Sequence, residues 1–273
     1  MSAIALERIT CSFATPRQGS YTAVEDVSLA VGETEFVSLI GPTGCGKSTL
    51  LNVMAGLHAP TAGQVTVFGR PQSGINRDAG YMFQADALMP WRTTLENVIA
   101  GLQFRGCEDR EARRLGREWL ERVGLSRFGD HHPHQLSGGM RKRAALAQML
   151  VLNPRIILMD EPFSALDVQT RQLMENELLA LWAADRRCAV FVTHDLEEAI
   201  ALSDRVVVLS AGPATRVLAE FEIRLPRPRD VAEVRLTPAF VEVHHRIWAA
   251  MRDEVTKAYR RSQQMGNGGV NGA

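Results

Sequence analysis

The chain has 273 residues, of which 45% are hydrophobic, so it is long enough to bury one large core or two small ones. Lys plus Arg and Asp plus Glu both number 31, and this balance disfavours a nucleic-acid-binding protein with a global positive field. Residues 1–8 lack a signal pattern and no apolar run approaches the ~18 residues that span a bilayer, so any membrane role is expected to be peripheral.

Two short apolar stretches open the chain, Ile4 to Ile9 and Val24 to Val31. They predict an antiparallel strand pair joined by a longer polar loop over residues 15–20. Phe13 lies at the start of this loop, where an exposed aromatic ring could stack on an adenine base. Packing of Phe13 on its own sheet is about equally well supported, and Tyr21 is a competing candidate.

A glycine-rich segment follows a strand predicted over residues 35–40 and precedes a helix that begins near Thr49. It consists of Gly41, Pro42, Thr43, Gly44, Cys45, Gly46, Lys47, Ser48 and Thr49. The glycines let backbone N–H groups turn toward the β- and γ-phosphates, Lys47 adds a positive charge, and the Ser48 hydroxyl is the expected Mg²⁺ ligand. A glycine-rich turn that binds nothing is the alternative, which the flanking strand and helix disfavour. The segment therefore predicts a nucleoside triphosphate site.

Further strands are predicted over residues 64–68 and 80–84, and the second ends in Gln84. Ligands of open α/β sheets bind at the carboxyl ends of the strands. The amide oxygen of Gln84 could therefore reach a metal ion or a water molecule. Taken alone, the same residue would be read as part of a surface loop.

A helical insert is predicted over about residues 92–152. Thr93 and Glu96 form a potential capping box for a helix that ends near Phe104. A second helix is indicated by apolar residues at helical spacing, namely Ala112, Leu115, Trp119, Leu120 and Val123. The charged residues from Arg105 to Arg117 are expected to form a solvated face, and partner contact is the lesser alternative. A metal site is disfavoured in the histidine-rich turn, residues 131–134, which lacks flanking ligands at suitable spacing beyond Asp130.

The remaining motifs combine glycine or acidic residues with predicted helix starts and strand ends. Ser137, Gly138 and Gly139 open a helix that runs to about Leu152, and this entry exposes N–H groups to an anion. Asp160 and Glu161 end an apolar strand, so Asp160 can reach a Mg²⁺ shell and Glu161 can orient a water for attack on the γ-phosphate. His194 follows the strand over residues 189–193 and can donate to developing phosphate charge.

The C-terminal part is predicted to contain strands over residues 206–209 and 216–223, then a helix capped at Thr237. An apolar stripe on this helix is expected to pack on the core: Phe240, Val243, Ile247, Met251 and Val255. The composition of residues 262–273 predicts a disordered tail. The expected organisation is a catalytic domain over residues 1–230, a helical extension over 231–261 and this tail.

The order of these motifs resembles the ATP-binding cassette (ABC) family from about Ile4 to Ile223. The resemblance implies a RecA-like P-loop NTPase core of the α/β class, with an antiparallel β layer and a helical insert subdomain. In this light residues 41–49 look like the Walker A loop, Gln84 like the Q-loop glutamine and residues 136–140 like the signature motif. Asp160 and Glu161 resemble the Walker B pair, residues 164–167 the D-loop, and His194 the switch histidine.

The resemblance implies a set of site residues. Catalytic roles fall on Glu161, His194 and Lys47, and Mg²⁺ would be bound by Ser48, Gln84 and Asp160. ATP is contacted by Phe13, by residues 41–49, by Gln84 and Asp160, and by Ser137, Gly138, Gly139 and Asp167. The family also implies a head-to-tail dimer, in which the signature residues of one copy close over ATP held by the other.

Two segments, Tyr81 to Trp91 and Leu225 to Asp230, look like the bacterial importers for nitrate, sulfonates, taurine and related solutes. The expected function is ATP hydrolysis for such an importer, at the cytoplasmic face of the cell membrane. Its partners would be a permease, a second and identical ATPase subunit and, indirectly, a solute-binding protein, without nucleic acid. Met140 in place of the common Gln occurs in this group, whereas Gln148 in place of Arg could alter packing or a membrane-subunit contact.

Three alternatives are weighed against the importer. The first is a soluble cassette ATPase acting on nucleic acid or ribosomes, whose long insertions or second cassette this chain lacks. The second is an exporter ATPase, and the third is a regulatory cassette that binds ATP without hydrolysing it. Intact Glu161 and His194 argue against the third. Cys11, Cys45, Cys107 and Cys188 lack paired spacing and fit a reducing compartment.

Overall fold

The computed structural model describes residues 2–15, 19–85, 87–164 and 166–267. The chain divides into two compact units. Unit 1 combines Met1–Asn76 with Cys188–Ala273, and unit 2 is Arg77–Arg187. In the described part of the chain, every helix falls short of the length or the apolar character that crossing a bilayer requires.

The first sheet of unit 1 is antiparallel. Its strands are β1 (Ser2–Thr15), β2 (Gly19–Gly32), β4 (Ala62–Val67) and β5 (Arg70–Pro71), in the order β2-β1-β4-β5. The predicted strand pair is confirmed, but the expected long loop is wrong. Register shifts carry the β1–β2 pairing through that segment, so that Phe13 lies opposite Tyr21 inside the sheet. Residues 16–18 of the expected loop lie outside the described part.

The second sheet of unit 1 contains β10 (Val217–Glu222), β9 (Arg205–Leu209), β3 (Phe36–Ile40) and β8 (Cys188–Val192), adjacent in that order. β3 pairs in parallel with both β8 and β9, whereas β10 is antiparallel to β9. Every residue of β3 and β8 is buried. Continuous apolar strands of this kind are typical of a parallel sheet covered on both faces. Two helices of this unit, α1 (Lys47–Met54) and α6 (Leu196–Leu202), contact these strands.

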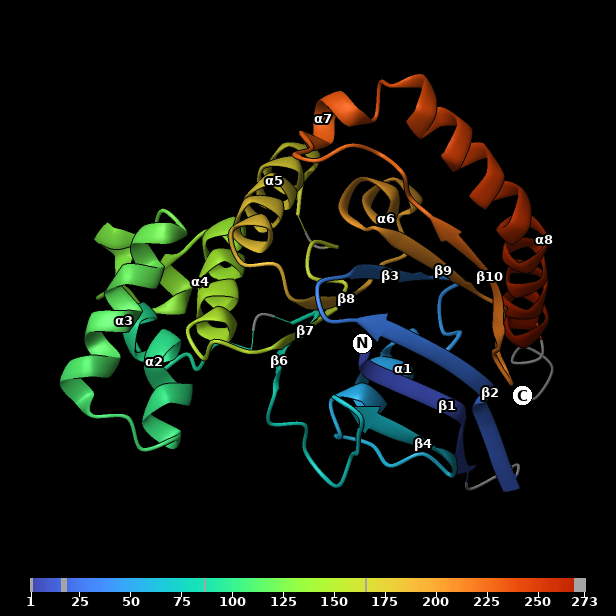
Figure 1. Cartoon of the computed structure of the whole chain (residues 1–273), viewed down its shortest axis with the longest axis horizontal. Coiled ribbons are helices and arrows are strands. Elements are labelled where there is room, and N and C mark those ends of the chain that lie inside the picture. Colours follow the sequence, from blue (N-terminus) through green and yellow to red (C-terminus); the bar gives the residue numbers. More distant parts are fainter. Residues whose placement is uncertain (1, 16–18, 86, 165, 268–273) are drawn as a thin grey trace. The chain divides into compact units, whose positions relative to one another are not determined.

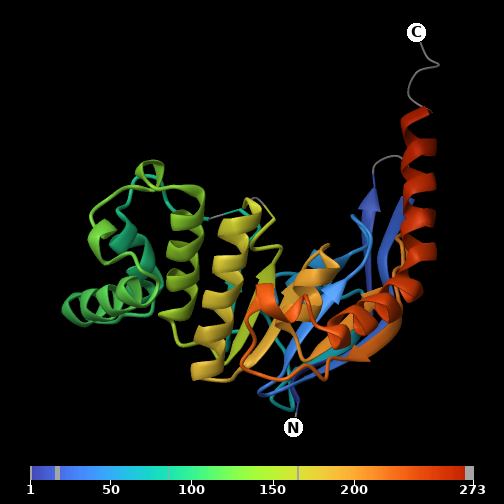
Figure 2. The same ribbon diagram turned by 90° about the horizontal axis from the view of Figure 1, so that it is seen from above.

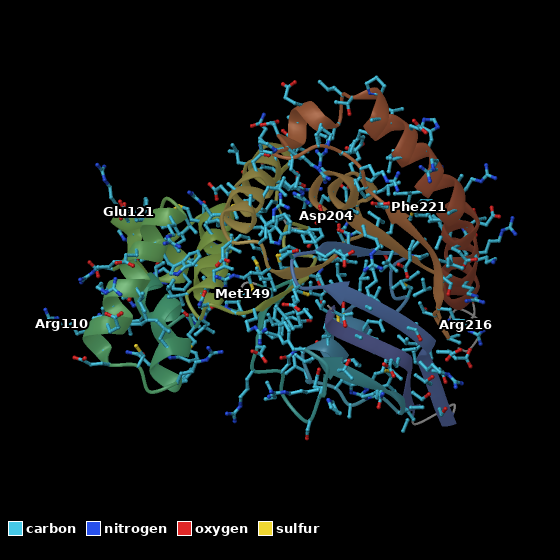
Figure 3. The ribbon with its side chains drawn as sticks, viewed as in Figure 1. Arg110, Glu121, Met149, Asp204, Arg216 and Phe221 are labelled. Carbon is cyan, nitrogen blue, oxygen red and sulfur yellow. The ribbon has the colours of Figure 1, made fainter. Side chains whose placement is uncertain are left out.

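The C-terminal helices of unit 1 are α7 (Val231–Val234) and α8 (Pro238–Asn267). Phe240, Ile247 and Met251 are buried where α8 lies along α6, β9 and β10, so the expected packing of this stripe is confirmed (Figures 1 and 2). The Arg246 guanidinium lies 5.9 Å from the centre of the Phe221 ring, which is labelled in Figure 3. Residues 262–267 of the expected disordered tail belong instead to α8. Residues 268–273 lie outside the described part.

The segment after β10 clamps the end of α6. The Arg227 guanidinium binds the Asp204 carboxylate at 2.8 Å and the Leu202 carbonyl at 2.7 Å. Arg229 is only 9% exposed. Its guanidinium donates to the carbonyl oxygens of Ile200, Ala201, Ser203, Ile223 and Leu225. The last carbonyl groups of a helix lack intrahelical partners, and here the arginines bind them and so join α6 to the chain that leaves β10.

Unit 2 contains the parallel strands β6 (Ala79–Met82) and β7 (Ile156–Asp160). Its helices are α2 (Thr94–Phe104), α3 (Asp109–Arg122), α4 (Gly138–Leu150) and α5 (Val168–Ala184), with short 3-10 turns at Ser126–Phe128 and Pro133–Gln135. The predicted capping box is confirmed, since Thr93 Oγ1 accepts from Glu96 N and Glu96 Oε2 accepts from Thr93 N. Figure 2 shows α4 and α5 running side by side.

The solvated face predicted for α3 is confirmed. Arg110 and Glu121 point away from the helices (Figure 3), and Arg114 forms ion pairs of 2.5 Å with both Glu111 and Glu118. The opposite face of α3 joins an apolar core with α2 and α4. In contrast, α5 is not among the predicted elements. Its fully buried apolar residues, such as Met174 and Trp182, form only a narrow stripe, which is a weak periodic signal.

Candidate nucleotide site

The glycine-rich segment forms a loop between β3 and α1. Lys47 is 5% exposed, and its Nζ donates to the carbonyl oxygens of Gly41 at 2.9 Å and Pro42 at 3.1 Å. Gly44 and Gly46 adopt φ values of 74° and 102°, which favour glycine. The segment thus curls around the ammonium group of its own lysine, which holds a positive charge within the loop.

The start of α1 is open to a ligand. Gly46 caps the helix without a side-chain hydrogen bond, and Ser48 and Gly44 are exposed. Free N–H groups at a helix start attract anions. Cys45 is buried beside Gly41, and burial raises the pKa of its thiol, with the Lys47 charge opposing this shift. The side chain of Cys45 therefore acts as a small buried group.

Phe13 has an aromatic partner within unit 1. Its ring is 37% exposed and stacks on His58, with the ring centres 4.8 Å apart and the planes inclined by 22°. Tyr21, on the opposing strand, is 39% exposed. Both aromatic rings are accessible, and adenine stacking on Phe13 stays a prediction.

His194 lies between β8 and α6, on a turn held by its neighbours. Thr193 Oγ1 binds the buried Glu198 carboxylate at 2.6 Å and accepts from Asp195 N at 3.0 Å. The Asp195 carboxylate caps α6 by accepting from the N–H groups of Glu197 and Glu198. Sequence reasoning missed Thr193 and Glu198. Glu198, four positions after His194, was the available signal in the sequence. Only the packing of α6 decides that its carboxylate is buried.

In unit 2 the structure brings Gln84 and Glu161 together. Gln84 Nε2 donates to Glu161 Oε2 at 3.3 Å. Tyr81 Oη donates to Asp160 Oδ2 at 3.4 Å, and burial and the Asp160 charge both raise the pKa of Tyr81. Glu161 has a φ of 43°, an uncommon conformation for a residue with a side chain. Backbone strain of this kind concentrates at functional sites.

Lys142 is a second contact that sequence reasoning missed. It is 3% exposed, and its Nζ donates to the backbone carbonyl of Gln84 at 2.6 Å. Lys142 stands in the basic run 141–143, which is typical of an exposed helix face. Only the packing of α4 against β6 shows that this one lysine is buried.

The predicted signature residues form the start of α4. Ser137 Oγ accepts from Met140 N at 3.3 Å, and both Ser137 and Gly138 are exposed. A Cβ on Gly139 would lie 2.8 Å from the Thr170 methyl group, which is too close unless one of the two groups shifts. Asp167 caps α5 by accepting from Thr170 N at 3.0 Å, and this hydrogen bond lowers the pKa of its carboxyl. Ala165, next to this cap, lies outside the described residues.

The oxygen donors predicted for Mg²⁺ are present in both units. Unit 1 provides the exposed Ser48 hydroxyl, and unit 2 provides the Asp160 carboxylate at the end of β7. Unit 2 also provides the Gln84 amide, which lies beyond β6, because this strand ends at Met82 and not at Gln84 as predicted. Hydroxyl, amide and carboxylate oxygens are hard ligands that Mg²⁺ accepts, so this donor set fits the ion. Among the residues that the structure describes, no cluster of His, Cys, Asp and Glu side chains forms a separate metal site.

A phosphate loop between a buried parallel strand and a helix, with acidic residues at a strand end, defines a P-loop ATPase. Residues 24–164 match the family model described as ABC transporter. An uncharacterized ABC transporter ATP-binding protein of Methanocaldococcus jannaschii is 45% identical over 238 residues, 87% of either chain. The chain therefore belongs to the ABC transporter family, and the resemblance seen in the sequence is confirmed.

Other relatives carry the names of import proteins. The taurine import ATP-binding protein TauB of Burkholderia pseudomallei is 40% identical over 89% of this chain and 95% of its own. The nitrate import ATP-binding protein NrtC of Synechococcus elongatus is 39% identical over 89% of this chain and 37% of its own. A solved dimeric ATP-binding cassette in a post-hydrolysis state, bound to ADP and Pi, has a TM-score of 0.73 at 34% identity. It covers 82% of this chain and 100% of its own.

Proposed function

We propose that this chain is the ATP-hydrolysing subunit of a bacterial importer for nitrate, a sulfonate, taurine or a related small solute. One observation carries this proposal: several relatives at 38–40% identity are named as nitrate, taurine and bicarbonate transport ATP-binding proteins. The proposed catalytic domain comprises residues 1–230, followed by a helical extension over 231–261.

ATP binding is assigned to residues of both units. Phe13 would stack on the adenine, while Lys47 and the N–H groups of residues 41–49 bind the β- and γ-phosphates. Ser48, Gln84 and Asp160 would hold Mg²⁺, which neutralises charge on the phosphates when it is bound.

The hydrolytic step is assigned to two side chains. Glu161 accepts a proton from the attacking water, and the Gln84 amide holds its carboxylate in place. His194 donates to the charge that develops on the γ-phosphate, from the turn fixed by Thr193.

The proposed assembly is a head-to-tail dimer of identical chains. Ser137, Gly138, Gly139 and Asp167 of one copy would close over the nucleotide of the other, so that ATP binding closes the dimer and hydrolysis reopens it. The exposed start of α4 leaves Ser137 and Gly138 accessible for such a contact. Dimeric cassettes among the solved relatives support this arrangement.

The permease-binding surface is assigned to an apolar groove within unit 2. The groove has a volume of about 300 Å³ and lies between β6, α2 and α4. Phe83 and Phe104 line it and are 45% and 78% exposed, and Met149, labelled in Figure 3, lies on its α4 side. Large exposed apolar side chains beside a groove are typical of a protein-binding surface. Gln84, which directly follows Phe83, would link permease docking to the catalytic carboxylate.

The importer proposal is tested by purifying the tagged chain from native membranes in mild detergent and identifying stoichiometric partners by mass spectrometry. A multi-span permease is the expected partner, at the cytoplasmic face of the cell membrane. Recovery of ribosomes, DNA or soluble proteins in its place would overturn the importer proposal and leave only the ATPase. In that case the soluble cassette acting on nucleic acid would take its place. If a permease is recovered, its sequence distinguishes an importer from an exporter.

The groove is tested in the same purification with the Phe104→Asp variant. Because an aspartate places a charge among apolar side chains, we expect the permease to be lost while the chain still binds ATP. Leu236→Asp is the matched control, since Leu236 is 79% exposed and lies outside the groove. Equal permease recovery with both variants would remove the groove from the proposal.

A further inference from the structure

The C-terminal helix α8 contacts the turn that follows β9. This turn, residues 210–216, is called the β9–β10 loop. Glu254 of α8 is 8% exposed, and its Oε2 accepts from Ala211 N at 2.8 Å. Lys257 Nζ binds the other oxygen of Glu254 at 2.5 Å, and the Arg261 guanidinium donates to the Gly212 carbonyl. Helix α8 therefore holds the Ala211 N–H group and the Gly212 carbonyl group.

The side of the β9–β10 loop that faces away from α8 packs against the phosphate loop. A Cβ added to Gly212 would lie 3.3 Å from the Gly44 carbonyl oxygen and 3.5 Å from Cys45 Cα. A Cβ added to Gly41 would lie 3.0 Å from the carbonyl oxygen of Leu209, the last residue of β9 before this loop. Glycine at both positions lets the two backbones approach without intervening side chains.

Strand β2 holds the other end of the β9–β10 loop. Ala214 N donates to Thr22 O at 2.7 Å, Thr215 N donates to Ala23 O at 3.1 Å, and Glu25 N donates to Thr215 O at 2.9 Å. The same stretch of β2 borders the phosphate loop, because a Cβ on Gly46 would lie 2.9 Å from the Val24 side chain. The phosphate loop therefore borders both β2 and the β9–β10 loop.

We propose that Glu254 and Arg261 are positioning residues for the phosphate loop, so that the seating of α8 controls nucleotide affinity. The proposal rests on the assignment of residues 41–49 to the phosphates. Neither side chain is among the residues assigned to the nucleotide. They act by holding Ala211 and Gly212, and the backbone at Gly212 packs against Gly44 and Cys45 of the phosphate loop. A partner that displaced α8 would loosen this support and weaken ATP binding.

The proposal is tested with the full chain by measuring the KM and kcat of ATP hydrolysis and the equilibrium binding of mant-ATP. Glu254→Ala leaves Ala211 N without its buried acceptor, and we expect KM and the Kd of mant-ATP to rise about tenfold. Glu254→Gln keeps an oxygen that can accept this hydrogen bond and should restore KM to within about twofold. Glu242→Ala, an exposed position on the same helix, is the control.

Arg261→Ala is a second, milder test. Arg261 is exposed, so the substitution does not remove a buried side chain. We expect a rise of about threefold in KM with kcat nearly unchanged. The neighbouring exposed Arg260→Ala is its control. Amide hydrogen exchange should quicken at residues 211–215 and 41–49 in both Glu254→Ala and Arg261→Ala, and in neither control.

A lowered melting temperature with unchanged KM, Kd and phosphate-loop exchange in these variants would overturn the proposal, because it would show a purely structural role. Lys47→Ala separates this outcome from an error in the site itself. If Lys47→Ala binds mant-ATP normally, then residues 41–49 are not the phosphate site and the underlying assignment is wrong. If Lys47→Ala loses binding while Glu254→Ala and Arg261→Ala do not, only the positioning role is wrong.

Discussion

Gln84 Nε2 donates a hydrogen bond to Glu161 Oε2 across 3.3 Å, and the buried Lys142 holds the backbone carbonyl of Gln84 at 2.6 Å. The Glu161 carboxylate, which comes directly after β7, is thus oriented by Gln84 in the segment beyond β6, and Gln84 is fixed in turn by Lys142 of α4. This chain of contacts links the strained Glu161, the groove beside Phe83 and the helix that starts at Ser137.

Glu161→Gln should retain ATP binding and lose most of its turnover. The amide has nearly the same size as the carboxylate, but it cannot accept a proton from the attacking water. We expect kcat to fall by about a hundredfold or more, which is the usual contribution of a general base. Steady-state hydrolysis and mant-ATP binding measure the two effects separately, and near-normal hydrolysis would remove Glu161 from the base role.

Lys47→Ala should weaken ATP binding itself. The variant removes the ammonium group that the carbonyl oxygens of Gly41 and Pro42 hold in the loop, and with it the positive charge offered to the phosphates. We expect Kd to rise by about tenfold or more, equivalent to at least about 1.4 kcal/mol. Arg260→Ala, which removes an exposed positive charge from α8, is the control. Lys257→Ala is unsuitable because Lys257 binds Glu254. Unchanged affinity in Lys47→Ala would contradict the phosphate assignment.

Thr193→Val should slow hydrolysis without weakening binding. The change removes the hydroxyl that binds Glu198 at 2.6 Å and accepts from Asp195 N, so the turn carrying His194 loses its support. We expect kcat to fall about fivefold to tenfold with KM nearly unchanged, since a lost buried hydrogen bond costs about 1–3 kcal/mol. Thr193→Ser keeps the hydroxyl and should restore the rate. A slow Thr193→Ser enzyme would point to the lost methyl group as the cause.

Arg229→Met should destabilise unit 1 more than any exposed arginine change. The buried guanidinium donates to carbonyls at the end of α6 and along the chain that leaves β10, and methionine leaves them unpaired. We expect the free energy of unfolding to fall by about 3 kcal/mol. Urea denaturation measures it, with Arg224→Met as control, because the exposed Arg224–Glu222 pair should contribute under about 1 kcal/mol. Similar losses in both variants would argue against the clamp.

Ionisation of the Glu254 carboxylate should make the stability of the folded chain depend on pH. Burial raises its pKa, but the hydrogen bonds from Lys257 and Ala211 outweigh burial and hold the pKa below the ordinary value of 4.5. A pKa lowered by folding means that the stabilisation is present above that value and is lost as the pH falls through the folded pKa. The melting temperature of Glu254→Gln should lie about 2 °C below that of the native chain at pH 7. This gap should close below pH 4.5, and a gap that persisted in acid would contradict the ionised state.

Local signals in the sequence were enough to predict much of the site. Gly41 to Thr49 has a strand before it and a helix after it, and the Thr93–Glu96 box marks the start of α2, because glycines and caps act on their immediate neighbours. The apolar run that ends in Asp160 predicts a buried strand for the same reason. The family follows from the order of such motifs, and the family model and relatives confirm it.

The tertiary structure decided which polar side chains are buried and what they hold. Lys142 reaches Gln84 from 58 residues away, Arg229 reaches Ala201 from 28 and Glu254 reaches Ala211 from 43. In the sequence these residues look like ordinary exposed charges on helices and loops. Their roles depend on which faces pack together, and one buried hydrogen bond leaves no periodic pattern in the chain. The sequence by itself predicted the glycine-rich loop and determined the family, whereas the packing of α4, α6 and α8 decided how that loop, Glu161 and His194 are supported.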